Sequence, residues 1–112
     1  MKKLTKYEAL TAALDRARLA ALEFSSVPDC GTCNFDSPAL DFSACGMTCP
    51  KAEQAIQAAG LRSYVWKVFG HRLLVICGFQ QGQGNRRTDM AEAFCASLKA
   101  EGYPCMMYYQ ID

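Results

Sequence analysis

Four of the seven cysteines in the chain lie close together in the sequence, at Cys30, Cys33, Cys45 and Cys49. Two residues separate the members of the first pair and three separate those of the second. Thiolates two residues apart on a glycine-containing turn can bind one ion together, and a second pair that closes a short loop completes the tetrahedron of a structural zinc site. The spacing therefore predicts that these four cysteines bind one zinc ion.

Two other uses of these cysteines stay open: unligated thiols in a loop, or a reversible dithiol formed by Cys30 and Cys33. The redox use is less favoured, because this pair neither follows a predicted strand nor opens a predicted helix, the setting that lowers a thiol pKa. Of the remaining cysteines, Cys77 and Cys95 fall on predicted core faces and are expected to pack as small apolar side chains. The sequence leaves Cys105 undecided between a buried and a surface position.

Catalytic residues are not evident. The single histidine, His71, lies in a predicted hairpin turn and faces no particular cysteine, so a thiol nucleophile would lack its base. Asp29, Asp36 and Asp41 fall in the cysteine-rich segment, and the other carboxylates decorate predicted helices, where they act as solubilising charges. The sequence therefore predicts a protein that is not an enzyme.

Composition limits the kinds of partner. The chain has 112 residues, about half of them hydrophobic, and a formal net charge of +1. Such a balance creates no global field that would attract nucleic acid or an anionic membrane. No apolar run approaches the roughly 20 residues of a membrane span, and the basic first residues lead into a polar helix. We therefore expect a cytoplasmic protein without membrane association, in a reducing compartment where structural disulfides are uncommon.

The first half of the chain is predicted to hold one helix and one loop. Thr5, followed three residues later by Glu8, forms a capping box, and apolar residues at helical spacing continue to predict a helix over residues 5–24. Proline and glycine then break the periodicity over residues 25–48, which also contain the four clustered cysteines. Within this loop, residues 39–44 could form a short strand.

The next segments predict a helix and a hairpin. Pro50 suits the first turn of a helix and Gly60 suits its end, so we expect a helix over residues 50–59. Two β-rich runs, residues 63–69 and 72–78, follow it, with Gly70-His71 between them as a two-residue type II′ turn.

The two faces of this hairpin are both apolar. One face is predicted to carry Tyr64, Trp66, Val68, Leu73, Val75 and Cys77. The other is predicted to carry Val65, Phe69, Leu74 and Ile76 with Lys67 and Arg72. We expect the first face to be the core, with Trp66 buried against the second and third helices. The second face is too apolar to stay bare, so the first helix or a partner should cover it.

The last segments complete the fold proposal. Thr88 is expected to cap a third helix that ends at Gly102, and residues 103–111 are predicted to form a central strand. Helix followed by β-α-β-β-α-β is the order of an α+β ferredoxin-like sandwich. The alternative is a three-stranded β-β-α-β sheet with packed helices. Either way, residues 1–112 form a single domain.

This domain is predicted to have three parts, and one of them resembles a known family. The parts are the helix at 5–24, the cysteine-rich loop at 25–48 and an α/β core at 49–112. Residues 38–110 resemble a heavy-metal-associated domain, a ferredoxin-like family whose GMTC-x-x-C loop matches Gly-Met-Thr-Cys ending at Cys49. The second thiolate of that motif is replaced by Ala52, so the motif by itself does not form a two-thiolate copper(I) site.

The favoured function is a non-enzymatic interaction module, adaptor-like or inhibitor-like, with a metal-stabilised loop and a protein partner or a second copy of itself. Phe69, Lys67 and Arg72 are the predicted contact patch, and Arg86 and Arg87, at a helix N-terminus, are a separate contact for an acidic surface. A soft-metal carrier of copper or zinc is the alternative, and a thiol redox protein comes third. Nucleic acid is less favoured, because both faces of the hairpin are apolar rather than basic.

Overall fold

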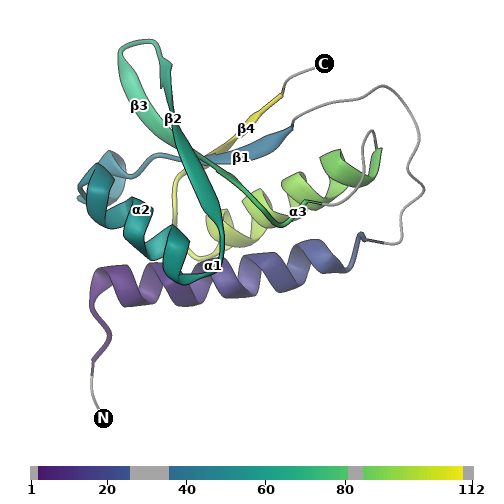
Figure 1. Cartoon of the computed structure of the whole chain (residues 1–112), viewed down its shortest axis with the longest axis horizontal. Helices are drawn as coiled ribbons and strands as arrows, with labels where there is room; N and C mark the ends of the chain where they lie inside the picture. The colour runs from purple at the N-terminus through teal and green to yellow at the C-terminus, as the bar shows by residue number, and fades with distance from the viewer. Residues whose placement is uncertain (1–2, 26–35, 81–84, 110–112) are drawn as a thin grey trace.

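The computed structural model describes residues 3–25, 36–80 and 85–109 (Figure 1). The elements in chain order are α1 (Lys6–Leu22), β1 (Ser37–Leu40), the 3-10 helix η1 (Ser43–Cys45), α2 (Cys49–Ala58), β2 (Arg62–Val68), β3 (His71–Cys77), α3 (Asn85–Ala100) and β4 (Cys105–Tyr108). The predicted α+β class with an N-terminal helix is thus confirmed. Among the described residues, no helix combines the length and the apolar character needed to cross a bilayer.

The strands form one antiparallel sheet with the order β2-β3-β1-β4. Helices α2 and α3 pack on one face of this sheet, α2 against β2 and β3, and α3 against β1 and β4. Helix α1 lies across α2 and α3 on the side away from the sheet, so the molecule has three layers (Figure 1). The three-stranded alternative is wrong, because β1 pairs with both β3 and β4. The last strand is an edge strand, not the central strand predicted.

Helix α1 forms where its local signals place it. The Thr5 hydroxyl accepts a hydrogen bond from the Glu8 amide at 3.1 Å, and the Glu8 carboxylate accepts one from the Thr5 amide at 3.0 Å. This confirms the capping box. The buried stripe of the helix consists of Leu10, Ala13, Leu14, Ala17 and Ala21. Its small side chains allow the close approach of α1 to α3, where Arg16 Nε donates to Glu101 Oε2 at 3.0 Å.

The strand predicted over residues 39–44 instead runs from Ser37 to Leu40. It ends early because the Asp41 carboxylate accepts hydrogen bonds from the Ala44 amide at 3.2 Å and the Ser43 hydroxyl at 3.1 Å. These bonds turn the chain into η1, since an aspartate side chain can replace the backbone partners that an extended strand would need.

Helix α3 begins earlier than predicted, at Asn85, so Thr88 lies inside the helix and does not cap it. The Thr88 hydroxyl donates to Asp36 Oδ2 at 2.8 Å. This bond links the first turn of α3 to the residue just before β1. The Thr88 hydroxyl therefore makes a tertiary contact instead of the local helix cap that the sequence predicted.

The hairpin turn is one residue earlier than predicted. Val68 pairs with His71, and Lys67 faces Arg72, so the connecting residues are Phe69 and Gly70. Both have positive φ, 49° and 79°, as a type I′ turn requires. The predicted Gly70-His71 turn is therefore wrong. This turn type suits the right-handed twist of the flanking strands, and that advantage outweighs the poor fit of phenylalanine to a left-handed backbone.

The predicted core face is also wrong, although residues 64, 66 and 68 do lie on one face with 73 and 75. Leu74 and Ile76 are fully buried in the cluster formed with the helices. Trp66 is half-buried and lies on the opposite face, away from α2 and α3. Both faces are about equally apolar in sequence, so the pattern alone could not select one. The aliphatic set packs under the helices, while the aromatic set can meet water at its edge.

The uncovered face of the sheet is shielded by two aromatic rings. Trp66 comes from one edge strand and Tyr108 from the other, and their centroids lie 4.6 Å apart in an edge-to-face arrangement. These rings pack over Ala39, Leu73 and Val75, which are buried although none of the described helices packs on this face. The ring pair thus makes a second, smaller core.

This ring contact should be measurable as a coupling between two substitutions. In a double-mutant cycle, Trp66→Ala and Tyr108→Ala should couple by about 0.5–1.5 kcal/mol, the usual worth of an aromatic pair beyond its buried area. Urea unfolding measures the four free energies. A cycle with Tyr109→Ala is the matched control, since Tyr109 is 62 % exposed and its hydroxyl donates to Glu92. Equal coupling in the two cycles would contradict the shielding role of the pair.

Candidate functional site

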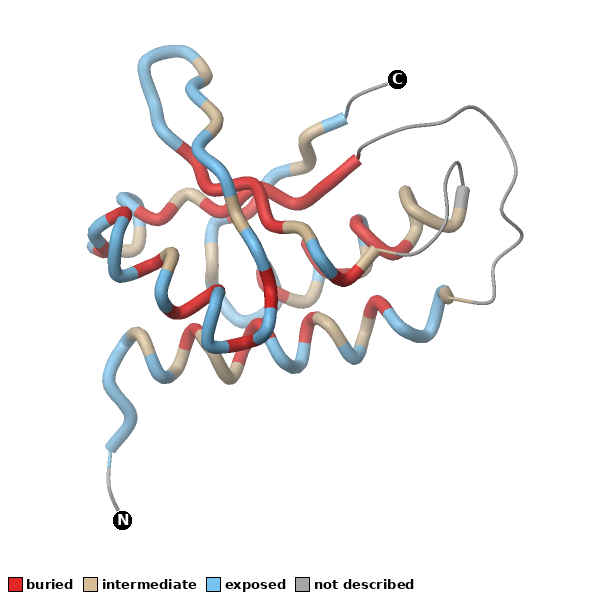
Figure 2. Tube along the Cα trace, viewed as in Figure 1, coloured by how far each residue is buried: buried red, intermediate tan, exposed pale blue. Residues whose placement is uncertain are grey.

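The most exposed part of the sheet is the end of the hairpin, residues 67–72, which we call the hairpin tip. It projects beyond the helical layer, and its residues are exposed along most of its length (Figures 1 and 2). Phe69 is 97 % exposed, more than any other large apolar side chain in the described part of the chain. Lys67 and Arg72 are exposed cross-strand partners beside it. Three of the predicted contact residues therefore lie together here.

The backbone of Phe69 adds a second anomaly to its exposure. Its φ of 49° makes it the single non-glycine residue with a left-handed backbone in the described segments. A side chain with a Cβ in this conformation loses roughly 1–2 kcal/mol relative to the right-handed region. Phenylalanine is thus unfavourable at this position both for the backbone and for hydration. Residues held in such conformations cluster at binding and switch sites, which makes Phe69 a candidate functional residue.

The charge around Phe69 is positive. Residues 67–72 contain Lys67, His71 and Arg72 and no carboxylate. Lys67 and Arg72 form no ion pair with any other residue that the structure describes. The Arg72 guanidinium lies 5.8 Å from the Phe42 ring centroid, which places its charge against the body of the protein. The hairpin tip thus combines one bare aromatic ring with unpaired cations.

The other two predicted contact residues lie elsewhere. Arg86 and Arg87 belong to the first turn of α3, and Arg87 Nη2 donates to the Ser37 hydroxyl at 3.3 Å, at the start of β1. This is the end of the sheet where Arg62 pairs with Cys77, opposite the hairpin turn. The predicted partner-binding set therefore divides into two separate places.

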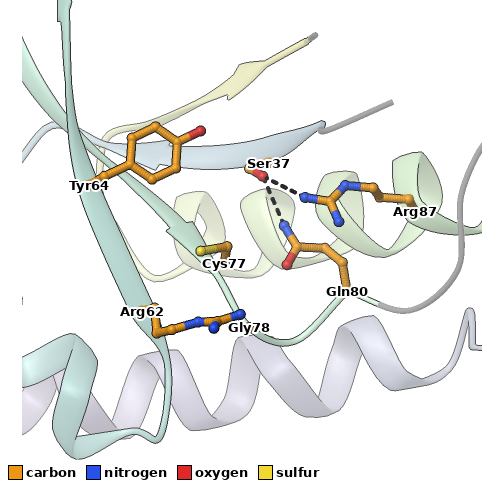
Figure 3. A pocket seen from close by; sticks show the side chains of 7 residues that line it. All are labelled: Ser37, Arg62, Tyr64, Cys77, Gly78, Gln80 and Arg87. Carbon is orange, nitrogen blue, oxygen red and sulfur yellow. Dashed lines mark hydrogen bonds between the residues drawn. The ribbon is translucent and has the colours of Figure 1, made fainter. Parts of the chain in front are cut away.

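At this second place the protein has a cavity of about 490 Å³, which we call the arginine pocket (Figure 3). Its walls are formed by Ser37, Arg62, Tyr64, Cys77, Gly78, Gln80 and Arg87. Sequence reasoning included Arg87 but missed the pocket, because its residues come from β1, β2, β3, the following loop and α3. It also placed Cys77 on a core face, whereas Cys77 is half-buried at the pocket. The available signal was Arg62, a cation at the end of an otherwise apolar face.

The predicted zinc ligands are only partly within the described residues. Cys30 and Cys33 lie outside them, so the four-cysteine site stays a prediction. Cys45 ends η1 and Cys49 begins α2, and each has a local partner: Cys45 Sγ lies 3.6 Å from the Asp41 carbonyl oxygen, and Cys49 Sγ lies 3.4 Å from Glu53 Oε1. Within the described segments, no three histidine, cysteine or acidic side chains gather into a metal-binding group.

The chemistry of these two thiols favours the protonated form. Burial raises the pKa of Cys49, and the hydrogen bond to Glu53 raises it further. Burial also raises the pKa of Cys45, with a contribution from Asp41. Because metals bind the thiolate, a zinc ion at this place would have to displace both protons and supply the charge that the protein alone does not provide.

Two further cysteines meet in the core. Cys95 on α3 and Cys105 on β4 are both buried, and their thiols influence each other's ionisation. The neighbouring Cys95 thiol raises the pKa of Cys105, and burial raises it further, so Cys105 holds its proton. The predicted packing role of Cys95 is confirmed by its burial, and the open question about Cys105 is resolved in favour of the core.

Comparisons with known proteins identify no relative. No protein-family model matches the chain, and no curated protein or solved structure gives a significant match. The hairpin tip, the cysteines and the arginine pocket are therefore the features of this protein that bear on its function.

The hairpin turn predicts opposite effects of two neighbouring substitutions on stability. Phe69→Asn should raise the free energy of unfolding by up to about 1 kcal/mol, because Asn-Gly is a preferred type I′ pair and asparagine tolerates the left-handed region. Gly70→Ala should lower it by roughly 1–2 kcal/mol. An added Cβ at Gly70 would have no atom within 4 Å, so this loss reports the backbone alone. Urea unfolding that shows Phe69→Asn to be destabilising would contradict the described turn.

Proposed function

We propose that the protein is a non-enzymatic, protein-binding module, of the adaptor or inhibitor kind, that inserts Phe69 into an apolar pocket of its partner. One observation carries the proposal: Phe69 is 97 % exposed on a left-handed backbone at the end of a projecting hairpin. Asparagine or glycine would be more stable at this position. The presence of phenylalanine there is explained if the side chain is buried on binding.

The physical chemistry of the hairpin tip fits this role. Burying an exposed phenylalanine contributes about 1.5–3 kcal/mol, and aromatic anchors of this kind dominate many interfaces. Lys67 and Arg72, cross-strand partners near the turn, give the hairpin tip a positive charge, which favours a partner with an acidic rim and steers the encounter. A convex hairpin end also suits a concave partner surface. The proposed contact is therefore an aromatic anchor with a cationic border.

The scaffold supports a precise presentation of this anchor. We propose that the sheet with α2 and α3 is a ferredoxin-like sandwich; the β-α-β-β-α-β order after α1 and the strand order β2-β3-β1-β4 support this assignment. Strand β3 is paired on both sides, with β2 and with β1. The hairpin is thus anchored in the sheet at its base and free at its tip.

The zinc ion is the second part of the proposal. Binding by Cys30, Cys33, Cys45 and Cys49 would tie residues 25–48 to the start of α2, and the spacing of the four cysteines supports it. A transferable copper(I) site at Cys49 has less support, because Ala52 stands where the resembled heavy-metal-associated motif has its second thiolate. We therefore propose a structural role for the metal.

A photo-crosslinking amino acid placed at position 69 tests the proposed contact. In cell extract it should form an adduct with one protein, because the ring enters a pocket of the partner. The same amino acid at position 19 is the matched control, since Leu19 is also well exposed, at 64 %, but lies on α1. Excess wild-type chain should compete for the adduct, whereas excess Phe69→Asn, although at least as stable, should compete at least tenfold less well.

Other outcomes of this experiment would overturn the proposal. Equal competition by wild type and Phe69→Asn would show that the ring contributes nothing to binding. An adduct removed by nuclease would identify nucleic acid rather than protein as the partner. An adduct equally strong at positions 19 and 69 would show unspecific capture.

A further inference from the structure

The arginine pocket is separate from the hairpin tip and carries its own inference. Arg62 and Tyr64 project from β2 on one side, Gln80 and Arg87 face them from the other, and Cys77 lies between (Figure 3). Two guanidinium groups therefore border one cavity of about 490 Å³. Cavities of this order of size hold small ligands in many proteins.

The lining of the pocket is cationic and contains no carboxylate among the described residues. The Arg62 side chain makes neither a hydrogen bond nor an ion pair with any other described residue. The Asp36 carboxylate also interacts electrostatically with Arg87. Asp36 is buried and does not line the pocket, and its Oδ2 accepts a hydrogen bond from Thr88 at 2.8 Å. The pocket thus presents, at Arg62, a positive charge that no other described lining residue neutralises.

A glycine lies beside Arg62 at the edge of the pocket. Gly78 has a φ of 103°, and a Cβ added there would lie 3.7 Å from Arg62 Nε and 3.6 Å from the Arg62 backbone nitrogen, at ordinary van der Waals distance. The Arg62 side chain therefore extends next to the Gly78 backbone. A side chain at residue 78 would fit the space but would be strained by the positive φ.

The second cation, Arg87, is held in place from β1 and the loop after β3. Arg87 Nη2 and Gln80 Nε2 both donate to the Ser37 hydroxyl, at 3.3 and 3.0 Å. Burial lowers the pKa of Arg87, which means that its charge is partly removed from water. A bound anion would offset this loss of hydration.

We propose that the arginine pocket binds the phosphate group of a small organic phosphate monoester. A phosphate group is a preferred ligand of guanidinium groups, and its several oxygens can accept hydrogen bonds from Arg62 and Arg87 together. The cavity is larger than a phosphate ion, so the organic part of the ligand would lie beside the Tyr64 ring, which is 46 % exposed. The inference is independent of the proposed contact at Phe69.

Phenyl phosphate is a suitable probe, because it combines the anion with a ring that can lie against Tyr64. In isothermal titration calorimetry at pH 7.5, the full chain should bind phenyl phosphate saturably, and inorganic phosphate and benzoate several-fold more weakly. Arg62→Gln and Arg87→Gln should each weaken phenyl phosphate binding at least tenfold. Lys99→Gln removes an exposed cation on α3 outside the pocket and should leave the affinity unchanged.

Arg62 is exposed and Arg87 contacts Ser37, so Arg62→Gln keeps the test decisive if Arg87→Gln fails to fold. Absence of saturable binding, or an Arg62→Gln variant that binds as well as the wild type, would overturn the proposal. Benzoate binding as tightly as phenyl phosphate would overturn the choice of phosphate. Inorganic phosphate binding as tightly as phenyl phosphate would show that the site takes the free ion and not an organic monoester. Retained phosphate binding in Phe69→Asn, together with lost cross-link competition, separates this site from the hairpin tip.

Discussion

The structure depends on one constraint: the sheet has two faces, and the helices that touch it, α2 and α3, pack on only one of them. The aliphatic side chains of Leu74 and Ile76 enter the helical core, so Trp66, which pairs with Leu73, lies on the other face. Trp66 and Tyr108 meet there and shield the smaller residues beneath them. Helix α1 packs on α2 and α3 rather than on this face of the sheet, and the hairpin tip projects beyond the described helices (Figure 1).

This arrangement places the hairpin tip and the arginine pocket at opposite ends of β2 and β3. At one end the turn exposes Phe69 between Lys67 and Arg72, and at the other end Arg62 and Arg87 border a cavity. The two ends differ in shape, since one is convex and the other hollow, and this difference fits a macromolecular contact at the first and a small anion at the second. The sheet face shielded by Trp66 and Tyr108 lies between these two ends.

Local signals in the sequence were sufficient for most of the elements. The Thr5 capping box and the Pro50 to Gly60 segment predicted two helices correctly, because their hydrogen bonds and backbone angles are decided within a few residues. The choice of core face was not local: it depends on where the helices pack. The turn was misplaced because Phe69 is unusual on a left-handed backbone. The arginine pocket was missed because it joins residues as distant as Ser37 and Arg87.

The central claim is that the Phe69 ring lies outside the fold in the free protein and becomes buried only in a complex. A fluorinated phenylalanine placed at position 69 measures this directly by 19F NMR. In the free protein the account predicts a narrow resonance with the full solvent shift between H2O and D2O, as expected for a ring that is 97 % exposed. Addition of the partner captured through position 69 should broaden the resonance and abolish that solvent shift. A resonance already shielded from solvent in the free monomer would contradict the account.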